Sequence, residues 1–203
     1  MKKVIVTQRF SKDKKTNEIR DALDIRLTRY LLGLKIFPIL IANSFGEKSP
    51  IFTKHFLDET KPHGLILTGG EDFGKNIPRD RLEKLLLKYF IRKKKPILGI
   101  CRGMQNLSLF FGSKLKKIKN HVNRRHSCEF LTKDKYFPKK IKCFHNYSIN
   151  TCPENFTVTV KSRDGSIESI KHNKHKWEGW MWHPERNYGD SKILKKRIIK
   201  IFK

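Results

Sequence analysis

The segment that decides the fold reads Gly99-Ile100-Cys101-Arg102-Gly103-Met104-Gln105, and it directly follows the apolar pair Ile97-Leu98. A short apolar strand ends at a cysteine, and a segment with helical pattern, residues 103–111, begins just after it. The glycines two positions before and two positions after the cysteine permit a tight turn from strand to helix. This is the sequence of a nucleophile elbow with cysteine in place of serine. Cys101 is therefore the candidate nucleophile, because the helix N-terminus beneath it would stabilise a thiolate.

Strands and helices alternate on both sides of this turn through the first 112 residues. Apolar runs predict strands over residues 3–7, 36–41, 64–68 and 97–100. The spacing of apolar residues predicts helices over 18–32, 51–59, 79–94 and 103–111, the first of them capped by Thr16 or Asn17. The alternation indicates a mostly parallel sheet with helices on both faces, and Pro38 favours an irregular or edge strand over 36–41.

The second half of the chain has shorter β-like runs, at 141–149, 156–161, 166–171 and 177–182, and a closing helix over 191–202. Asp164-Gly165 is a hairpin-type turn. The sequence contains no internal repeat, linker or low-complexity segment. We therefore expect a single α/β domain over residues 1–203, with extra β elements in its second half.

Charge and hydropathy narrow the classes of protein to which this chain can belong. The chain has 46 Lys and Arg against 19 Asp and Glu, a formal net charge of +27, which is typical of a nucleic-acid binder. The basic residues are spread along the whole chain and no recognition motif accompanies them, so a nucleic-acid-binding module is the weaker alternative. The positive electrostatic field of this charge would also concentrate an anionic small substrate.

No window of 18 apolar residues exists and the N-terminus lacks a signal-peptide core, so we expect a cytoplasmic protein without a membrane span.

Two further motifs supply what a nucleophilic cysteine needs. The first is His183-Pro184-Glu185, near the C-terminus. His183 would be the base that takes the thiol proton and returns one to the leaving group, and Glu185 would be the acid that fixes the tautomer of His183. The intervening proline favours an extended segment, on which His183 and Glu185 would point the same way. Gly69-Gly70 ends the strand predicted over 64–68, and glycines let backbone N–H groups approach an oxyanion. Each motif alone fits an ordinary loop, so the hypothesis depends on their combination with the elbow.

The order of these motifs resembles the class I glutamine amidotransferase-like superfamily, which has a flavodoxin-like α/β fold. Within it, the fit is closer to the γ-glutamyl-γ-aminobutyrate hydrolase type. The marks run from residue 7 to residue 185 and are Thr7-Gln8-Arg9, Leu67-Thr68-Gly69-Gly70, the elbow, Asp164-Gly165-Ser166-Ile167-Glu168 and Trp182-His183-Pro184-Glu185.

The resemblance implies a catalytic triad of Cys101, His183 and Glu185 that cleaves a γ-glutamyl amide through a thioester on Cys101. It also implies an oxyanion hole from the backbone N–H groups of Gly70 and Arg102. The glutamyl group would be held by Gly69 and Gln105. No cofactor and no bound metal are expected.

The sequence departs from the hydrolase type in the segment that would face the leaving group. The hydrolases tend to carry Val-Asn-Ser-x-His-His-Gln there, in their second half. Here the stretch is Lys142-Cys143-Phe144-His145-Asn146-Tyr147, in which His145 aligns as a substrate-binding residue among changed neighbours. The stretch 121–126 resembles the His-rich loop that precedes this strand in the hydrolases. The small size and the basic residues look most like γ-glutamyl-CDP-amidate hydrolases of bacterial capsule phosphoramidate pathways. An anionic leaving group would suit the arginines, whose guanidinium groups bind phosphate bidentately: Arg9, Arg102, Arg124, Arg125 and Arg186.

Two other interpretations stay open. A glutaminase subunit would use the same triad but would hand ammonia to a separate synthetase partner. A metal site could involve His121, His126, Cys128, Cys143 and His145, which are close in sequence, but their spacing lacks the paired ligands of structural zinc.

Overall fold

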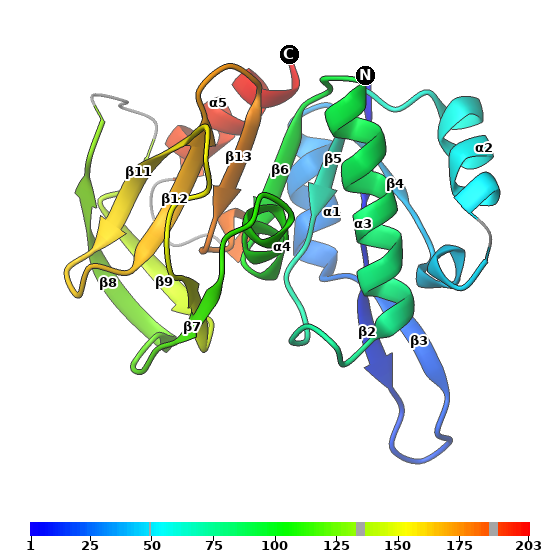
Figure 1. Ribbon diagram of the computed structural model, residues 1–203, viewed down its shortest axis with the longest axis horizontal. Coiled ribbons are helices and arrows are strands. Elements are labelled where there is room, and N and C mark those ends of the chain that lie inside the picture. The colour runs from blue at the N-terminus through cyan, green and yellow to red at the C-terminus, as the bar shows by residue number, and fades with distance from the viewer. Residues whose placement is uncertain (49, 133–136, 187–190) are drawn as a thin grey trace.

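A nine-stranded sheet with the order β4-β1-β5-β6-β13-β12-β11-β8-β9 forms the centre of the computed structural model, which describes residues 1–48, 50–132, 137–186 and 191–203 (Figure 1). Neighbouring strands are parallel from β4 to β13 and antiparallel from β13 to β9. The predicted mixed α/β fold with a mostly parallel core is confirmed. The strands are β1 (Lys2–Val6), β4 (Ile36–Leu40), β5 (Gly64–Leu67), β6 (Ile97–Ile100), β8 (Val122–Phe130), β9 (Lys140–Phe144), β11 (Phe156–Ser162), β12 (Ile167–His172) and β13 (Trp177–Trp180).

Helices cover both faces of the parallel part, as the alternating sequence predicted. Alternate residues of β1 point to opposite faces, so Val4 and Val6 join the apolar cluster under α1 (Ile25–Gly33) and α5 (Ser191–Phe202). Ile5 joins the cluster under α2 (Pro50–Thr60), α3 (Ile77–Arg92) and α4 (Arg102–Phe110). Strands β5 and β6 are buried on both faces, which is why they consist of apolar residues and glycine alone. Strand β4, which contains Pro38, lies at the edge of the sheet, as expected.

The helix predicted over 18–32 is wrong over residues 18–24. Residues Ile19–Ala22 form β3, which pairs antiparallel with β2 (Arg9–Lys12), and α1 begins at Ile25 with Asp24 as its cap. The carboxylate of Asp13 accepts the backbone N–H groups of Lys15 and Thr16, and so competes with a helix start there. The β2–β3 hairpin extends from the end of the molecule opposite to both termini (Figure 1).

The second half also differs in detail from the prediction. The run 141–149 is not one strand: β9 ends at Phe144, and β10 (Tyr147–Ile149) pairs instead with β7 (Leu115–Lys117) in a separate small sheet. Most of 121–126, expected as a loop, lies in β8. Single-sequence patterns do not show which partner a short strand takes, and the break at His145 and Asn146 sends the chain to a second sheet.

Candidate active site

The predicted elbow is present between β6 and α4. Cys101 is the N-cap of α4 with φ 53° and ψ −111°, a backbone conformation that non-glycine residues rarely adopt. Its backbone N–H donates to the carbonyl of Trp180 on the neighbouring strand β13 (2.7 Å), which holds the strained residue in place. Cys101 is nearly buried, at 6% exposure.

The two glycines of the elbow are required by close backbone approach. A Cβ on Gly99 would lie 2.5 Å from the carbonyl oxygen of Gly103, and one on Gly103 would lie 2.1 Å from that of Leu67. Neither position has room for a side chain, because the backbone atoms in contact cannot move without shifting β5 or α4. Both positions of the tight strand-to-helix turn therefore require glycine.

His183 and Glu185 meet, although by a different local structure from the expected one. Pro184–Arg186 forms a short 3-10 helix, η2, rather than an extended segment, and the fixed φ of proline suits the first position of a helical turn. His183 Nδ1 and Glu185 Oε1 are 2.7 Å apart. The imidazole also lies over Gly69: a Cβ there would be 2.8 Å from His183 Cε1 and 3.5 Å from the Cβ of Cys101. Gly69 thus leaves the space in which the cysteine and the histidine meet.

The protonation of His183 follows from its two partners. Burial opposes the charged imidazolium, but the hydrogen bonds to Cys101 and Glu185 outweigh it and raise the pKa of His183 to about 9. At neutral pH the histidine is therefore protonated. An imidazolium placed between a cysteine sulfur and the side chain of a glutamate is the arrangement that a cysteine nucleophile requires.

A fully buried arginine, Arg79 on α3, orients the backbone at the end of β5. Its Nη2 donates to the carbonyl oxygens of Thr68 (2.9 Å) and Gly69 (3.1 Å). Because a trans peptide places C=O and N–H on opposite sides, the N–H of Gly70 points away from Arg79. Gly70 has φ 150°, and a Cβ there would lie 2.3 Å from Arg79 Nη1. Glycine is thus required by the close approach of the arginine.

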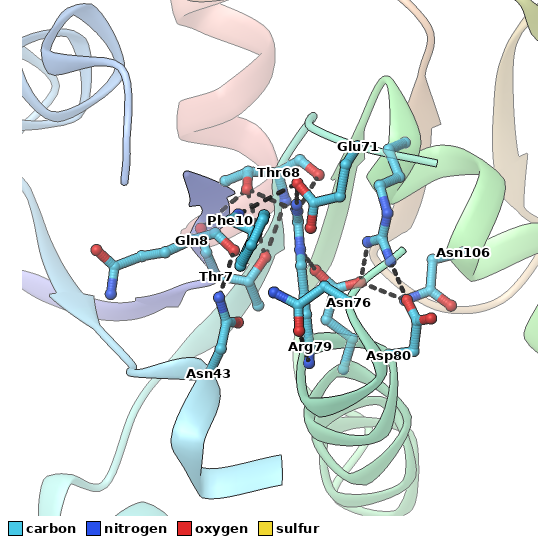
Figure 2. A network of polar contacts seen from close by, with 12 residues as sticks. Thr7, Gln8, Phe10, Asn43, Thr68, Glu71, Asn76, Arg79, Asp80 and Asn106 are labelled. Carbon is cyan, nitrogen blue, oxygen red and sulfur yellow. Dashed lines mark hydrogen bonds and ion pairs between the residues drawn. The ribbon is translucent and has the colours of Figure 1, made fainter. Parts of the chain in front are cut away.

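Arg79 is held in turn by a network of polar contacts, in which Figure 2 shows Arg79, Glu71 and Asp80. It pairs with Glu71 (3.0 Å) and with Glu83 (2.9 Å), and Arg102 pairs with Glu83 and Asp80. Burial disfavours both charges, yet the paired charges raise the pKa of Arg79 and lower the pKa of Glu83, so both stay ionised. The loop after β5 and the start of α4 are therefore fixed to the same end of α3.

Cys101, His183 and Glu185 line a cavity of about 590 Å³. The hairpin β2–β3 forms part of its wall, and Glu71 Oε2 accepts the backbone N–H of Phe10 (3.2 Å) to hold the hairpin against the site. Among the described residues, the cations that line the cavity are Arg9 on β2 and Arg186 on η2. The guanidinium of Arg186 stacks 4.4 Å from the ring of Phe144, and this ring stands edge-on to His183, with ring centres 6.0 Å apart.

Other sequence-predicted residues lie elsewhere. Gln105 Nε2 donates to the carbonyl of Tyr147 (2.9 Å), and His145 Nδ1 contacts the same oxygen (3.0 Å). Neither side chain belongs to the cavity wall among the described residues, and the same holds for Arg124, exposed on β8. The Arg102 guanidinium is occupied by its ion pairs with Asp80 and Glu83 and does not line the cavity, so it does not serve the predicted leaving-group role. The oxyanion role predicted for its backbone N–H stays a prediction.

Sequence reasoning missed Arg79, Glu83 and Phe144. A signal existed for the first two: an arginine and a glutamate four residues apart, both within the otherwise apolar face of α3. Phe144 had no signal, since its approach to His183 depends on how β9 ends.

Comparison with known proteins agrees with this geometry. The family model for glutamine amidotransferase class-I matches residues 26–201. The chain belongs to this family. A γ-glutamyl-CDP-amidate hydrolase of Campylobacter jejuni is 33% identical over 135 residues, covering 64% of this chain and 65% of that protein. A GMP synthase of Limosilactobacillus reuteri is 30% identical over 165 residues, covering 78% of this chain but 30% of that protein, so the chain spans less than two thirds of either relative.

Solved structures of this glutamine amidotransferase class show the same fold. A protein from Thermoplasma acidophilum that is assigned to GMP synthase superimposes with a TM-score of 0.75 at 22% identity, covering 99% of this chain and 94% of that one. A glutamine amidotransferase from Thermotoga maritima gives 0.68 at 16% identity, with 98% and 96% covered. Within the described ranges, the helices lack the combination of length and apolar character that a membrane span requires.

Proposed function

We propose that this class I glutamine amidotransferase relative hydrolyses a γ-glutamyl amide whose leaving group is an anionic nucleotide phosphoramidate, as in γ-glutamyl-CDP-amidate. The observation that carries the proposal is one cavity that holds Cys101, His183 and Glu185 together with the arginines Arg9 and Arg186. The 33% identical C. jejuni relative, named for this substrate, supports it.

The chemistry proceeds in two steps. The Cys101 thiolate attacks the γ-carbonyl carbon, and the negative charge on the carbonyl oxygen is stabilised by the backbone N–H groups of Gly70 and Arg102. His183 gives its proton to the departing nitrogen as the C–N bond breaks and the thioester forms. Water then loses a proton to His183 and adds to the thioester, the C–S bond breaks, and glutamate leaves. With a phosphoramidate, the P–N bond stays intact and the nucleotide keeps its nitrogen.

The cavity arginines fit an anionic leaving group. Arg186 Nε is buried and has no hydrogen-bond acceptor within the described ranges; its nearest carboxylate oxygen, on Glu185, is 3.9 Å away. Arg9 lies beside Gly70: its Cβ is 3.0 Å from where a Cβ on that glycine would be. Phosphate oxygens at these two cations would place the amide carbonyl between the arginines and Cys101.

The proposal is tested by glutamate release from L-glutamine, γ-glutamyl-aminobutyrate, a γ-glutamyl polyamine and γ-glutamyl-CDP-amidate. The nucleotide phosphoramidate is expected to give the highest kcat/KM. Replacing Arg9 or Arg186 with Gln should lower that value by ~10–150-fold, which corresponds to the ~1.5–3 kcal/mol of a charge-assisted hydrogen bond. Hydrolysis of γ-glutamyl-aminobutyrate should change far less. Arg124→Gln, on the exposed face of β8, is the matched control and should leave both rates unaltered. Equal losses on all substrates would refute the assignment of these arginines to the leaving group.

A second candidate is a glutaminase subunit that supplies ammonia to a synthetase. The GMP synthase of L. reuteri, 30% identical over 78% of this chain, favours it. Glutamine would then be the preferred substrate, and its hydrolysis would rise on addition of a synthetase partner. Fast, partner-independent release from the phosphoramidate excludes this role.

The pH dependence checks the part played by His183. Because its pKa is raised to about 9, the imidazolium that protonates the leaving group is present below this pH and is lost above it. We expect kcat/KM to fall on the alkaline side with a midpoint near pH 9. Glu185→Gln removes a charge that raises the pKa, so this limb should move to lower pH, whereas Glu154→Gln at an exposed position should leave it in place. An alkaline limb that is identical in the Glu185→Gln variant would show that another group controls it.

A further inference from the structure

A second cluster of chemically active side chains lies outside the cavity. His121 precedes β8, Cys143 is on β9, His145 follows β9, and Glu168 is on β12. All four are buried: the side chains of His121 and Glu168 have 0% exposure, that of His145 has 1%, and Cys143 has 0%. One nitrogen, sulfur or oxygen atom from each lies within 4.8 Å of the others. The proposed hydrolysis uses none of these atoms.

The outer hydrogen bonds of both histidines fix which ring nitrogen faces inward. His145 Nδ1 is 3.0 Å from the carbonyl of Tyr147, which can only accept, so this nitrogen carries a proton and Nε2 is the nitrogen that faces inward. His121 Nε2 is 2.7 Å from a carboxylate oxygen of Asp164, so this nitrogen donates to Asp164 and Nδ1 is the nitrogen that faces Glu168. A carboxylate or a carbonyl behind the ring is the usual support of a metal-binding histidine.

The inward atoms lack hydrogen-bond partners. His121 Nδ1, His145 Nε2 and Glu168 Oε1 are buried and make no hydrogen bond of good geometry within the described ranges, although the carboxylate of Glu168 faces both imidazoles. An unpaired buried polar atom is costly, and three that converge on one point require an explanation. An electron-pair acceptor placed between them would satisfy all three.

The separations from Glu168 suit a small tetrahedral ion, and the other pairs of ligand atoms lie within 4.8 Å. Glu168 Oε1 is 3.3 Å from His121 Nδ1, and Glu168 Oε2 is 3.5 Å from both His145 Nε2 and Cys143 Sγ. A tetrahedron with metal–ligand distances of about 2.0–2.3 Å has edges of about 3.3–3.8 Å. The donors are one sulfur, two imidazole nitrogens and a carboxylate, a set that suits zinc and not the all-oxygen preference of calcium or magnesium.

We propose that His121, Cys143, His145 and Glu168 bind one Zn²⁺ as a structural site. Four protein ligands would close the coordination shell, so the ion would stabilise β8, β9 and β12 rather than activate water. Its position next to the cavity gives it a consequence for the active site. Cys143 and His145 flank Phe144, whose ring contacts both His183 and Arg186, so the ion would fix this part of the cavity wall. The inference does not rest on the proposed reaction.

The sequence points only partly to this site. The sequence places His121, Cys143 and His145 close together, but it places His126 and Cys128 beside them and Glu168 far away. The carboxylate lies 25 residues beyond Cys143 and joins the cluster only because β12 folds back against the end of β9. The expectation of no metal was therefore reached without the fourth ligand.

Metal analysis tests the site without reference to activity. We expect the full chain, dialysed against zinc and then against buffer, to retain one zinc per chain. Replacement by Co²⁺ should give the visible bands of a tetrahedral ion and a near-ultraviolet thiolate-to-cobalt band. That band should vanish in Cys143→Ser and persist in the matched control Cys152→Ser. Asp164→Asn, which alters the support of His121 and no ligand atom, should weaken zinc binding by about 10–100-fold.

Two results would overturn the proposal. One is a folded wild-type chain that retains no zinc after dialysis, since the four side chains would then be joined to one another by hydrogen bonds without a metal ion. The other is cobalt bound without a thiolate band, or with a band that Cys143→Ser leaves intact. Because the first result uses the unaltered chain, failure of a variant to fold does not affect the test, and loss of zinc binding is separate from any failure of the proposed hydrolysis.

Discussion

Replacing Cys101 with alanine is expected to abolish glutamate release while the fold stays intact. The substitution removes only the sulfur atom, and the strained backbone at this position is supported by the bond from its N–H to Trp180, which alanine keeps. Loss of a nucleophile from a triad lowers turnover by about 10⁴-fold or more, because the remaining residues cannot form the covalent intermediate. The measurement is the rate of glutamate release at saturating substrate, together with the thermal midpoint of each protein.

The matched control is Cys152→Ser, since Cys152 is also a free cysteine, is part-buried and is not among the cavity residues. It should keep the wild-type rate. Acid-quenched wild-type protein should carry a γ-glutamyl adduct on the peptide that contains Cys101, and the Cys101→Ala variant should carry none. Turnover of Cys101→Ala within tenfold of wild type would show that the thioester chemistry is wrong.

The sequence was most informative where backbone geometry and chemistry coincide. At the elbow, the glycines at 99 and 103 are required by contacts with backbone atoms, so the spacing around Cys101 could be interpreted directly. The alternation of apolar strands and amphipathic helices likewise predicted the parallel core, because both faces of such a sheet must be covered. His183 and Glu185 lie in contact although the turn that joins them is a 3-10 helix and not a strand, and their catalytic roles stay predictions.

Features that depend on long-range packing could not be predicted in this way. The β2–β3 hairpin replaces the start of a predicted helix because its strands are held by distant groups: Glu71 contacts Phe10, and the carboxylate of Asp21 accepts the backbone N–H of Asn43 (2.8 Å). Ile19 fits the helical pattern but is 68% exposed on the hairpin. Likewise, nothing in the sequence shows that His145 lies outside the cavity wall, beside His121 and Glu168.

Replacing Arg79 with methionine is expected to have the second large effect, on stability and on turnover together. The change leaves Glu71 without its guanidinium partner and Glu83 with only one of two, and removal of one partner from a buried ion pair costs about 3–5 kcal/mol. For a chain of this size that lowers the thermal midpoint by about 6–20 °C. Arg81→Met, two residues along the same helix at an exposed position, should change the midpoint by little.

The effect on turnover follows from the carbonyl groups that Arg79 holds. Without Nη2, the peptide between Gly69 and Gly70 is free to rotate, and the Gly70 N–H no longer has a fixed direction toward the oxyanion. Because an oxyanion donor acts on the transition state, kcat should fall by about 10²–10³-fold with little change in KM, when assayed well below the lowered midpoint. Arg79→Lys would keep the charge beside Glu83 but cannot bridge two carbonyls and two carboxylates, so it should recover stability more than kcat. A variant that loses stability but keeps wild-type kcat would assign Arg79 to the fold alone, and the direction of the Gly70 N–H would then have to be set by β5 itself.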